Sequence, residues 1–261
     1  MIDINITHID TACCLIEIDG FKILTDPVLD EAGGYYHHGW GTVSRKTSSP
    51  AISDEGLEGV QLVLLSHPQH KDNFDKKGQA FSRGVPLIIS TTRIEKNWTN
   101  GRGLHPWESH NIQLPSGKEM KITATPALHH PCWLPGFFAG EVIGFVLEFS
   151  GSDTCIYITG DTVYFKGIEE VAERFPGITT AIIHVGGVQF PYLTARGQYT
   201  MDATGFLRTV RTLQPRQAIP IHNSGWTHFK ETDSNLKRMV SEYPDIRDRV
   251  LFLHSGHRVA L

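Results

Sequence analysis

Four apolar, strand-like segments of this sequence end in a side chain that can bind a metal ion. The residues at these four ends are His67, His129, Asp161 and His222. His70 and Asp72 follow shortly after the first of them. Imidazole and carboxylate groups are the protein ligands of zinc, iron and manganese. One histidine at the end of a strand usually has a structural role, but four such endings in one chain favour a metal site.

Strand ends are suitable positions for such ligands because a sheet fixes each end, while the following loops leave room for a substrate. The motifs of other common hydrolases and nucleotide-binding proteins are missing. The sequence contains no G-x-S-x-G, no G-x-x-x-x-G-K-[ST] and no H-E-x-x-H pattern. The residue types therefore indicate metal-dependent chemistry.

The elements that position these ligands follow from hydrophobic periodicity. Alternating segments at 4–7, 14–18 and 21–24 predict a hairpin-rich start of the chain. Further strands are expected at 60–66, 86–90, 120–125, 142–149, 154–159, 180–185, 218–221 and 250–253. Residues 29–58 are rich in Gly, Tyr, His, Ser and Pro, and we expect a long loop there.

Helical patterns lie between several of these strands. Thr200 is the expected N-cap of one helix, with Asp202 in its first turn. A later helix has its apolar face at Leu236, Met239, Val240 and Tyr243. Hairpins followed by alternating strands and helices predict an α/β protein with two sheets covered by helices, in a single domain over residues 1–261.

The ligand-bearing segments resemble the motifs of a known family. The stretch from Val63 to Asp75 resembles the H-x-H-x-D-H signature of the metallo-β-lactamase superfamily. Other matching segments occur in the family's order along the whole chain, at 7–8, 24–27, 124–129, 159–162, 220–222 and 225–226. The chain looks most similar to the branch that includes the ascorbate-6-phosphate lactonase. The resemblance implies the αββα four-layer sandwich of the metallo-β-lactamase fold.

The resemblance also implies a role for each ligand. His67, His70 and His129 would hold a first metal, Asp161 would bridge two metals, and Asp72 and His222 would hold the second. The cofactors would be one or two divalent transition metals: zinc, manganese or iron. A metal-bound hydroxide would be the nucleophile, with catalytic roles for Asp72, Asp161 and His8.

The sequence departs from the signature in two places. The run from His67 to Asp72 is one residue longer than in the family, so either a bulge accommodates the extra residue or His67 is not a ligand. Asn73 occupies the position of the last signature histidine. An amide is a poorer ligand than an imidazole, so we expect a weaker second site that prefers manganese or iron, or stays empty.

Several further residues are candidates for supporting the metals or contacting the substrate. Asp26 would orient a metal-bound histidine or cap the turn after its strand. His130 is the alternative to His129, since a strand directs only one of the pair inward. His184 would line the cleft or be a hydrogen-bonded core histidine. The remaining candidates are His8, Asn73, Tyr36 in a loop that would either cover the substrate or be an ordinary solvated loop, and Trp226 as a pocket wall beside His228.

These observations predict a metal-dependent hydrolase of a small lactone, ester or phosphoester, with a sugar-derived compound as the leading substrate. A phosphodiesterase or nuclease of the same fold is one alternative. A non-hydrolytic metal- or ligand-binding relative is another, because Asn73 departs from the signature.

Charge and composition limit the partners and the compartment. The formal net charge is −4 and the basic residues are scattered, so no nucleic acid partner is expected. No apolar run approaches the ~20 residues of a membrane helix. The four cysteines form no C-x-x-C pair and no signal peptide precedes them, which favours a cytoplasmic protein. A small-molecule substrate is the expected partner, and the sequence leaves the oligomeric state open.

Overall fold

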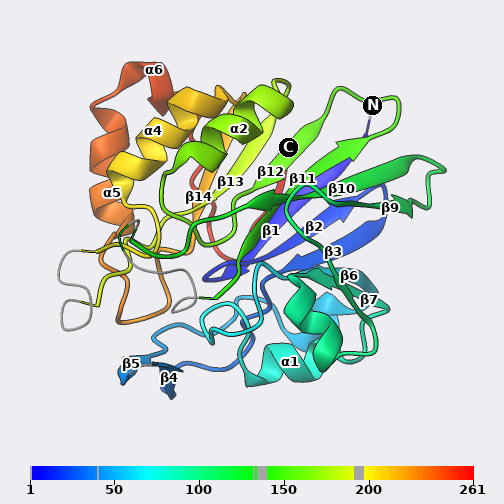
Figure 1. Cartoon of the computed structure of the whole chain (residues 1–261), viewed down its shortest axis with the longest axis horizontal. Helices are drawn as coiled ribbons and strands as arrows, with labels where there is room; N and C mark the ends of the chain where they lie inside the picture. The colour runs from blue at the N-terminus through cyan, green and yellow to red at the C-terminus, as the bar shows by residue number, and fades with distance from the viewer. Residues whose placement is uncertain (1, 40, 132, 134–139, 191–196) are drawn as a thin grey trace.

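Two β-sheets pack face to face in this protein, and helices cover their outer faces (Figure 1). The structure is a computed structural model that describes residues 2–39, 41–131, 133, 140–190 and 197–261. The expected αββα arrangement is confirmed. Apolar side chains from both sheets meet between them, including Ile6 and Ile16 from one sheet and Ile122 and Leu147 from the other.

The first sheet has the strand order β15-β1-β2-β3-β6-β7-β8. Its strands are β1 (Ile4–Asp10), β2 (Cys13–Ile18), β3 (Phe21–Thr25), β6 (Val60–Leu64), β7 (Leu87–Ser90), β8 (Gly101–Gly103) and β15 (Arg258–Ala260). The first three strands form an antiparallel meander, as the alternating pattern predicted. β3, β6, β7 and β8 run parallel, so their carboxyl ends lie at the same edge.

The second sheet has the order β14-β13-β12-β11-β10-β9. Its strands are β9 (Ser109–Gln113), β10 (Glu119–Pro126), β11 (Ile143–Phe149), β12 (Cys155–Ile158), β13 (Thr180–His184) and β14 (Gln217–Ile221). β12, β13 and β14 are parallel neighbours. Their carboxyl ends therefore place Asp161, His184 and His222 side by side.

Each sheet has its own helical cover. α2 (Lys166–Arg174), α4 (Ala203–Leu213), α5 (Asp233–Ser241) and α6 (Pro244–Arg247) contribute to one apolar cluster on the outer face of the second sheet. On the first sheet, α1 (Lys76–Ser82), η1 (Asp54–Leu57) and η2 (Thr92–Lys96) accompany a second cluster. Figure 1 shows α1 on the opposite side of the molecule from α2, α4, α5 and α6.

Three expectations about the elements were wrong. Residues 250–253 form no strand, since only Val250 pairs with another segment, through an isolated β-bridge to Ala218. The alternating side chains of this segment instead pack into the apolar cluster between the sheets and the cluster outside the second sheet. The expected loop at 29–58 contains a hairpin of β4 (Tyr35–Gly39) and β5 (Thr42–Arg45). Asp202, not Thr200, caps α4: its carboxylate accepts from the Gly205 backbone, whereas the Thr200 hydroxyl accepts from Val188 N.

The cysteines of the described part of the chain are free thiols. Cys13, Cys14 and Cys155 are buried and form no disulfide. Cys132 lies outside the described residues.

Candidate metal centre

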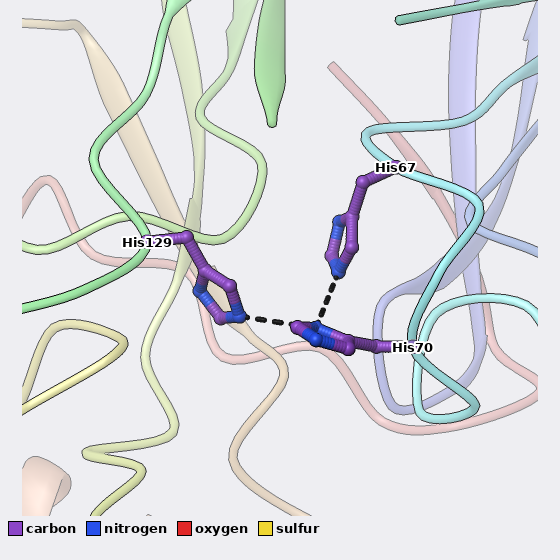
Figure 2. A group of neighbouring side chains, drawn as sticks. All are labelled: His67, His70 and His129. Atoms are coloured by element: carbon purple, nitrogen blue, oxygen red, sulfur yellow. Dashed lines mark hydrogen bonds between the residues drawn. The ribbon is translucent and has the colours of Figure 1, made fainter. Parts of the chain in front are cut away.

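His67, His70 and His129 point their imidazole rings at one another (Figure 2). His67 Nε2 lies 2.9 Å from His70 Nδ1, and His129 Nε2 lies 3.2 Å from the same atom. Ligand atoms of the three residues all fall within 4.8 Å of one another. The extra residue in the signature therefore does not keep His67 away from the other two histidines.

The outer nitrogens of this first cluster are already engaged. His129 Nδ1 lies 2.9 Å from the Tyr199 carbonyl oxygen, which can only accept, so this nitrogen carries the proton of the ring. His67 Nδ1 contacts Ser66 Oγ at 2.9 Å. Burial lowers the pKa of His67 and brings that of His129 to about 3, so both rings are neutral. Neutral imidazoles with lone pairs directed at a common point fit a divalent cation.

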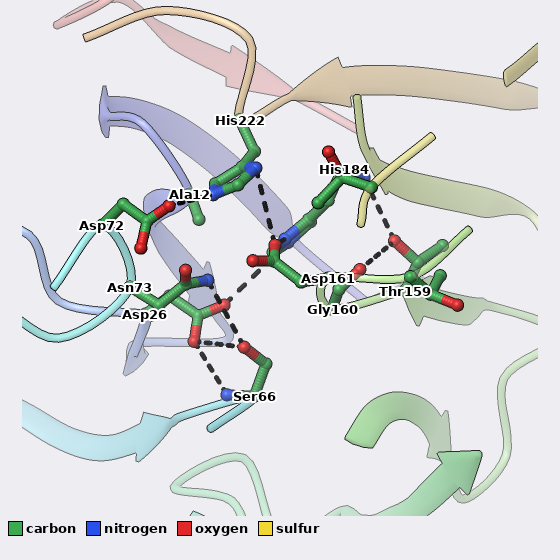
Figure 3. A network of polar contacts seen from close by, with 12 residues as sticks. Ala12, Asp26, Ser66, Asp72, Asn73, Thr159, Gly160, Asp161, His184 and His222 are labelled. Carbon is green, nitrogen blue, oxygen red and sulfur yellow. Dashed lines mark hydrogen bonds and ion pairs between the residues drawn. The ribbon is translucent and has the colours of Figure 1, made fainter. Parts of the chain in front are cut away.

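Asp161, His184 and His222 form a second cluster at the ends of β12, β13 and β14 (Figure 3). His184 Nδ1 and His222 Nδ1 lie 2.9 and 3.5 Å from Asp161 Oδ1. All three side chains are fully buried. Among the described residues, Asp161 Oδ2, His184 Nε2 and both nitrogens of His222 find no hydrogen-bond partner. Buried polar atoms are normally paired, so this group also fits a cation.

Asp72 lies on the other side of the His222 ring. Its Oδ2 atom is 3.8 Å from His222 Nε2 and 3.0 Å from His228 Nε2. His228 thus orients Asp72, a contact that the sequence did not reveal. Asp161 Oδ2 is 4.0 Å from His129 Nε2, so Asp161 lies between the two clusters.

The backbone around these ligands is held in unusual conformations. His222 has a φ of 63°, in the left-handed region that costs about 1–3 kcal/mol for a residue other than glycine. Its N–H donates to the Thr11 carbonyl at 2.8 Å, which fixes this conformation. Gly160 before Asp161 has a φ of 62°, and a Cβ there would lie 2.5 Å from the Ile143 carbonyl oxygen. Only glycine fits at this turn.

Asp26 belongs to the network beneath the clusters. Its Oδ1 accepts from Ser66 N at 2.7 Å and Ser66 Oγ at 2.8 Å. Asp26 therefore reaches His67 through Ser66, and its Oδ2 lies 3.9 Å from His184 Nε2. Burial raises the pKa of Asp26 to about 7.

Asn73 also faces this network. Its Nδ2 lies 3.5 Å from Ser66 Oγ. Burial and the nearby Asp72 raise the pKa of Asp161 well above the usual range. The side chain in the position of the last signature histidine thus lies in the network beneath the clusters.

Three of the residues named from the sequence lie outside both clusters. His8 uses both ring nitrogens, at 3.0 Å from Ser255 Oγ and 3.1 Å from the Thr11 carbonyl oxygen. Tyr36 donates its hydroxyl to Asp30 at 2.8 Å and packs edge-on against Trp226, whose indole N–H donates to Thr11. These contacts place the three residues in support of the surrounding loops. Their predicted contacts with a substrate stay predictions.

His130 is not part of the first cluster, and its Nδ1 lies 2.9 Å from the Pro131 carbonyl oxygen. We expect His129→Ala to lose most of the bound metal and His130→Ala to retain it. Elemental analysis of the two purified variants after dialysis checks this expectation. Equal metal contents would show that His129 is not a ligand.

Comparison with known proteins identifies the family. Residues 22–223 match the family model described as the beta-lactamase superfamily domain. The chain is 28% identical to a UPF0173 metal-dependent hydrolase of Pyrococcus furiosus, over 99% of this chain and 100% of the relative. It is 31% identical to a UPF0173 metal-dependent hydrolase of Nanoarchaeum equitans, over 72% of this chain and 81% of the relative.

Solved structures share the fold. An isothiocyanate hydrolase from Delia radicum gut bacteria has a TM-score of 0.80 at 24% identity, with 98% of each chain covered. A metallo hydrolase from Ignicoccus hospitalis has a TM-score of 0.71 at 19% identity, with 99% of this chain and 98% of the other covered. In the described part of the protein, no helix is both long and apolar enough to cross a membrane.

The matched segment includes the candidate ligands from His67 to His222, and the relatives are named as metal-dependent hydrolases. The chain belongs to the metallo-β-lactamase superfamily and is a metal-dependent hydrolase.

Proposed function

We propose that this protein hydrolyses a small lactone, ester or phosphoester at a centre of one or two divalent metals. The observation that carries the proposal is the pair of buried ligand clusters with Asp161 between them. A sugar-derived lactone or phosphoester, as in the ascorbate-6-phosphate lactonase branch, is the leading candidate substrate.

In this proposal, His67, His70 and His129 hold the first metal. Asp161 faces both positions, and Asp72 and His222 hold the second. A divalent metal bound there (zinc, manganese or iron) supplies Lewis acidity and activates water at neutral pH.

The surrounding residues keep these ligands in place. Asp26 and Ser66 fix the outer nitrogen of His67, and the Tyr199 carbonyl fixes that of His129. His228 holds Asp72. Such partners behind the ligands set ring orientation and metal affinity.

A cleft beside His129 supports a small-molecule substrate. It has a volume of about 430 Å³, within the size range of small-molecule sites. Thr91, His130 and Glu141 contribute polar groups to it, and Val142 and Ile143 contribute apolar ones.

The alternatives receive less support. The net charge of −4 does not favour a nuclease or another phosphodiesterase of nucleic acids. The relatives are hydrolases, so a non-hydrolytic binding protein is not proposed.

We further propose a single domain over residues 1–261 and a cytoplasmic location, with a small molecule and no nucleic acid as the partner.

Metal removal and reconstitution test the proposal. Protein stripped by a chelator is expected to melt at a lower temperature, because a metal that binds only the folded state stabilises it by RT ln(1 + [L]/Kd). Zinc, manganese or iron should restore both the melting temperature and hydrolysis in a screen of lactones, esters, phosphoesters and isothiocyanates. A melting temperature that does not respond to any metal would refute the proposed centre.

A further inference from the structure

The buried ring of His184 lies between two carboxylates at the base of the candidate metal centre (Figure 3). Its Nδ1 is 2.9 Å from Asp161 Oδ1, and its Nε2 is 3.9 Å from Asp26 Oδ2. The ring stacks on His222, with centroids 5.3 Å apart and an interplanar angle of 23°. Its Nε2 has no hydrogen-bond partner among the described residues.

With both carboxylates ionised, as next to a bound cation, a proton count shows that this arrangement lacks one positive charge. A neutral imidazole carries one N–H, and an ionised carboxylate only accepts. A proton on Nε2 leaves the Nδ1 lone pair directed at Asp161 Oδ1. A proton on Nδ1 leaves Nε2 buried without a partner, because 3.9 Å exceeds hydrogen-bond length. A cation shared by Nδ1 and Asp161 removes the conflict, and the Nε2 proton then faces Asp26.

That orientation is typical of a metal-bound histidine, which binds through one nitrogen and directs its other N–H at a carboxylate or carbonyl. His129 shows the same pattern, with Nε2 toward its cluster and Nδ1 toward the Tyr199 carbonyl. Metal bonds to nitrogen and oxygen are about 2.0–2.2 Å long. The separations of 2.9 and 3.5 Å from Asp161 Oδ1 to His184 Nδ1 and His222 Nδ1 are therefore those of ligands that share one ion.

The position of Asn73 explains why another imidazole is needed. The signature places a histidine there, but this chain has the amide of Asn73, whose Nδ2 lies 3.5 Å from Ser66 Oγ. His184 supplies a ring nitrogen to Asp161 from the end of β13. The loss of one imidazole on the loop after β6 thus coincides with the presence of another on the second sheet.

We propose that His184 is a ligand of the second metal, together with Asp161 and His222, in place of the imidazole that Asn73 lacks. The inference rests on the proposed metal centre. It assigns the second metal to the Nδ1 side of His222, whereas Asp72 faces the Nε2 side. In this arrangement His184, and not Asp72, completes the ligand set of the second metal.

The variant His184→Asn tests whether His184 binds the metal or only positions Asp161. The asparagine amide can still donate to Asp161, but the imidazole is gone. His110→Asn is the control, because His110 lies on β9 outside both clusters. Elemental analysis and zinc titration of the stripped proteins measure stoichiometry and affinity. We expect His184→Asn to bind about one metal fewer per chain, with the second affinity lowered more than about 100-fold, and the control to match the wild type.

Wild-type protein provides an independent measurement. In the Co(II)-loaded form, each ligating imidazole gives a hyperfine-shifted N–H signal in the proton NMR spectrum. One of these signals should belong to His184 under selective histidine labelling. An unshifted His184 signal would overturn the inference. So would a loss of metal affinity in His184→Asn of only about 10–100-fold, which is typical when a residue that hydrogen-bonds to a metal ligand is removed. If wild-type protein binds no metal at all, the proposed function itself fails.

Discussion

The substitution Asp161→Asn is expected to change the stability of the metal-free and metal-loaded protein in opposite directions. Without metal, the Asp161 carboxylate is fully buried beside Asp72, and burial raises its pKa well above the usual range. Asparagine removes this charge at nearly the same volume. The Asp161 oxygens lie 3.5 Å from His222 Nδ1 and 4.0 Å from His129 Nε2. With metal, the variant has only one side-chain oxygen and no charge, so it cannot offer a carboxylate oxygen to both clusters.

The pH dependence of the metal-free protein follows from the sign of this shift. A carboxyl group with a raised pKa in the folded state binds more protons there than in the unfolded state, so stability falls as pH rises. The stabilisation from proton binding to Asp161 is fully present below the pKa of about 3.9 that the group has in the unfolded chain. It is lost as the pH rises through the higher pKa that Asp161 has in the folded protein. Asp161→Asn should therefore stabilise metal-free protein increasingly above about pH 4.

Thermal melts of both forms between pH 4 and 8 test this expectation, together with metal content and hydrolysis rate. Metal-loaded Asp161→Asn should melt below the metal-loaded wild type and lose at least about a hundredfold in kcat/KM, as when a group that stabilises the transition-state charge is removed. Asp153→Asn is the control, because Asp153 is an exposed carboxylate. A variant that is less stable than the wild type in both forms would mean that Asp161 has a structural partner instead.

The candidate metal ligands on strand ends could be predicted from the sequence because each is marked by a local pattern. An apolar alternating segment predicts a strand, and a histidine or aspartate shortly after its end lies at the sheet edge. His67, His129, Asp161 and His222 all follow this rule. The two sheets and their helical cover also follow from periodicity, since each element buries one face or both.

The remaining contacts could not be predicted because they join segments that are far apart in the chain. His184 ends an apolar strand like the others, but its two carboxylate neighbours come from the ends of β3 and β12. His228 reaches Asp72 across 156 positions of sequence. The apolar alternation of 250–253 predicted a strand. In the structure, its side chains pack alternately into two apolar clusters, but its backbone does not join a sheet.

A second feature without a local signal is the buried ion pair between Lys46 and Asp10. The Lys46 side chain is fully buried, and its ammonium group also donates to the Ser48 carbonyl at 2.9 Å. Asp10 accepts a further hydrogen bond from Ser48 Oγ at 2.6 Å. The backbone of Lys46 forms a bridge with Trp226, which follows shortly after His222. The ion pair therefore holds the segment after β5 against the end of β1. The Lys46 backbone also holds this segment against the loop that follows the candidate ligand His222.

Removing one member of this pair is expected to cause a large loss of stability. Lys46→Met keeps the length of the side chain but leaves the Asp10 carboxylate buried without its counter-ion, which costs about 3–5 kcal/mol. The double variant Lys46→Met/Asp10→Asn removes both charges and should recover a large part of that loss, because neutral groups need no counter-ion. Denaturant unfolding of the metal-stripped proteins gives both free energies without a contribution from metal binding. If the single and double variants unfold at the same denaturant concentration, the stability comes from the packing of the lysine side chain and not from its charge.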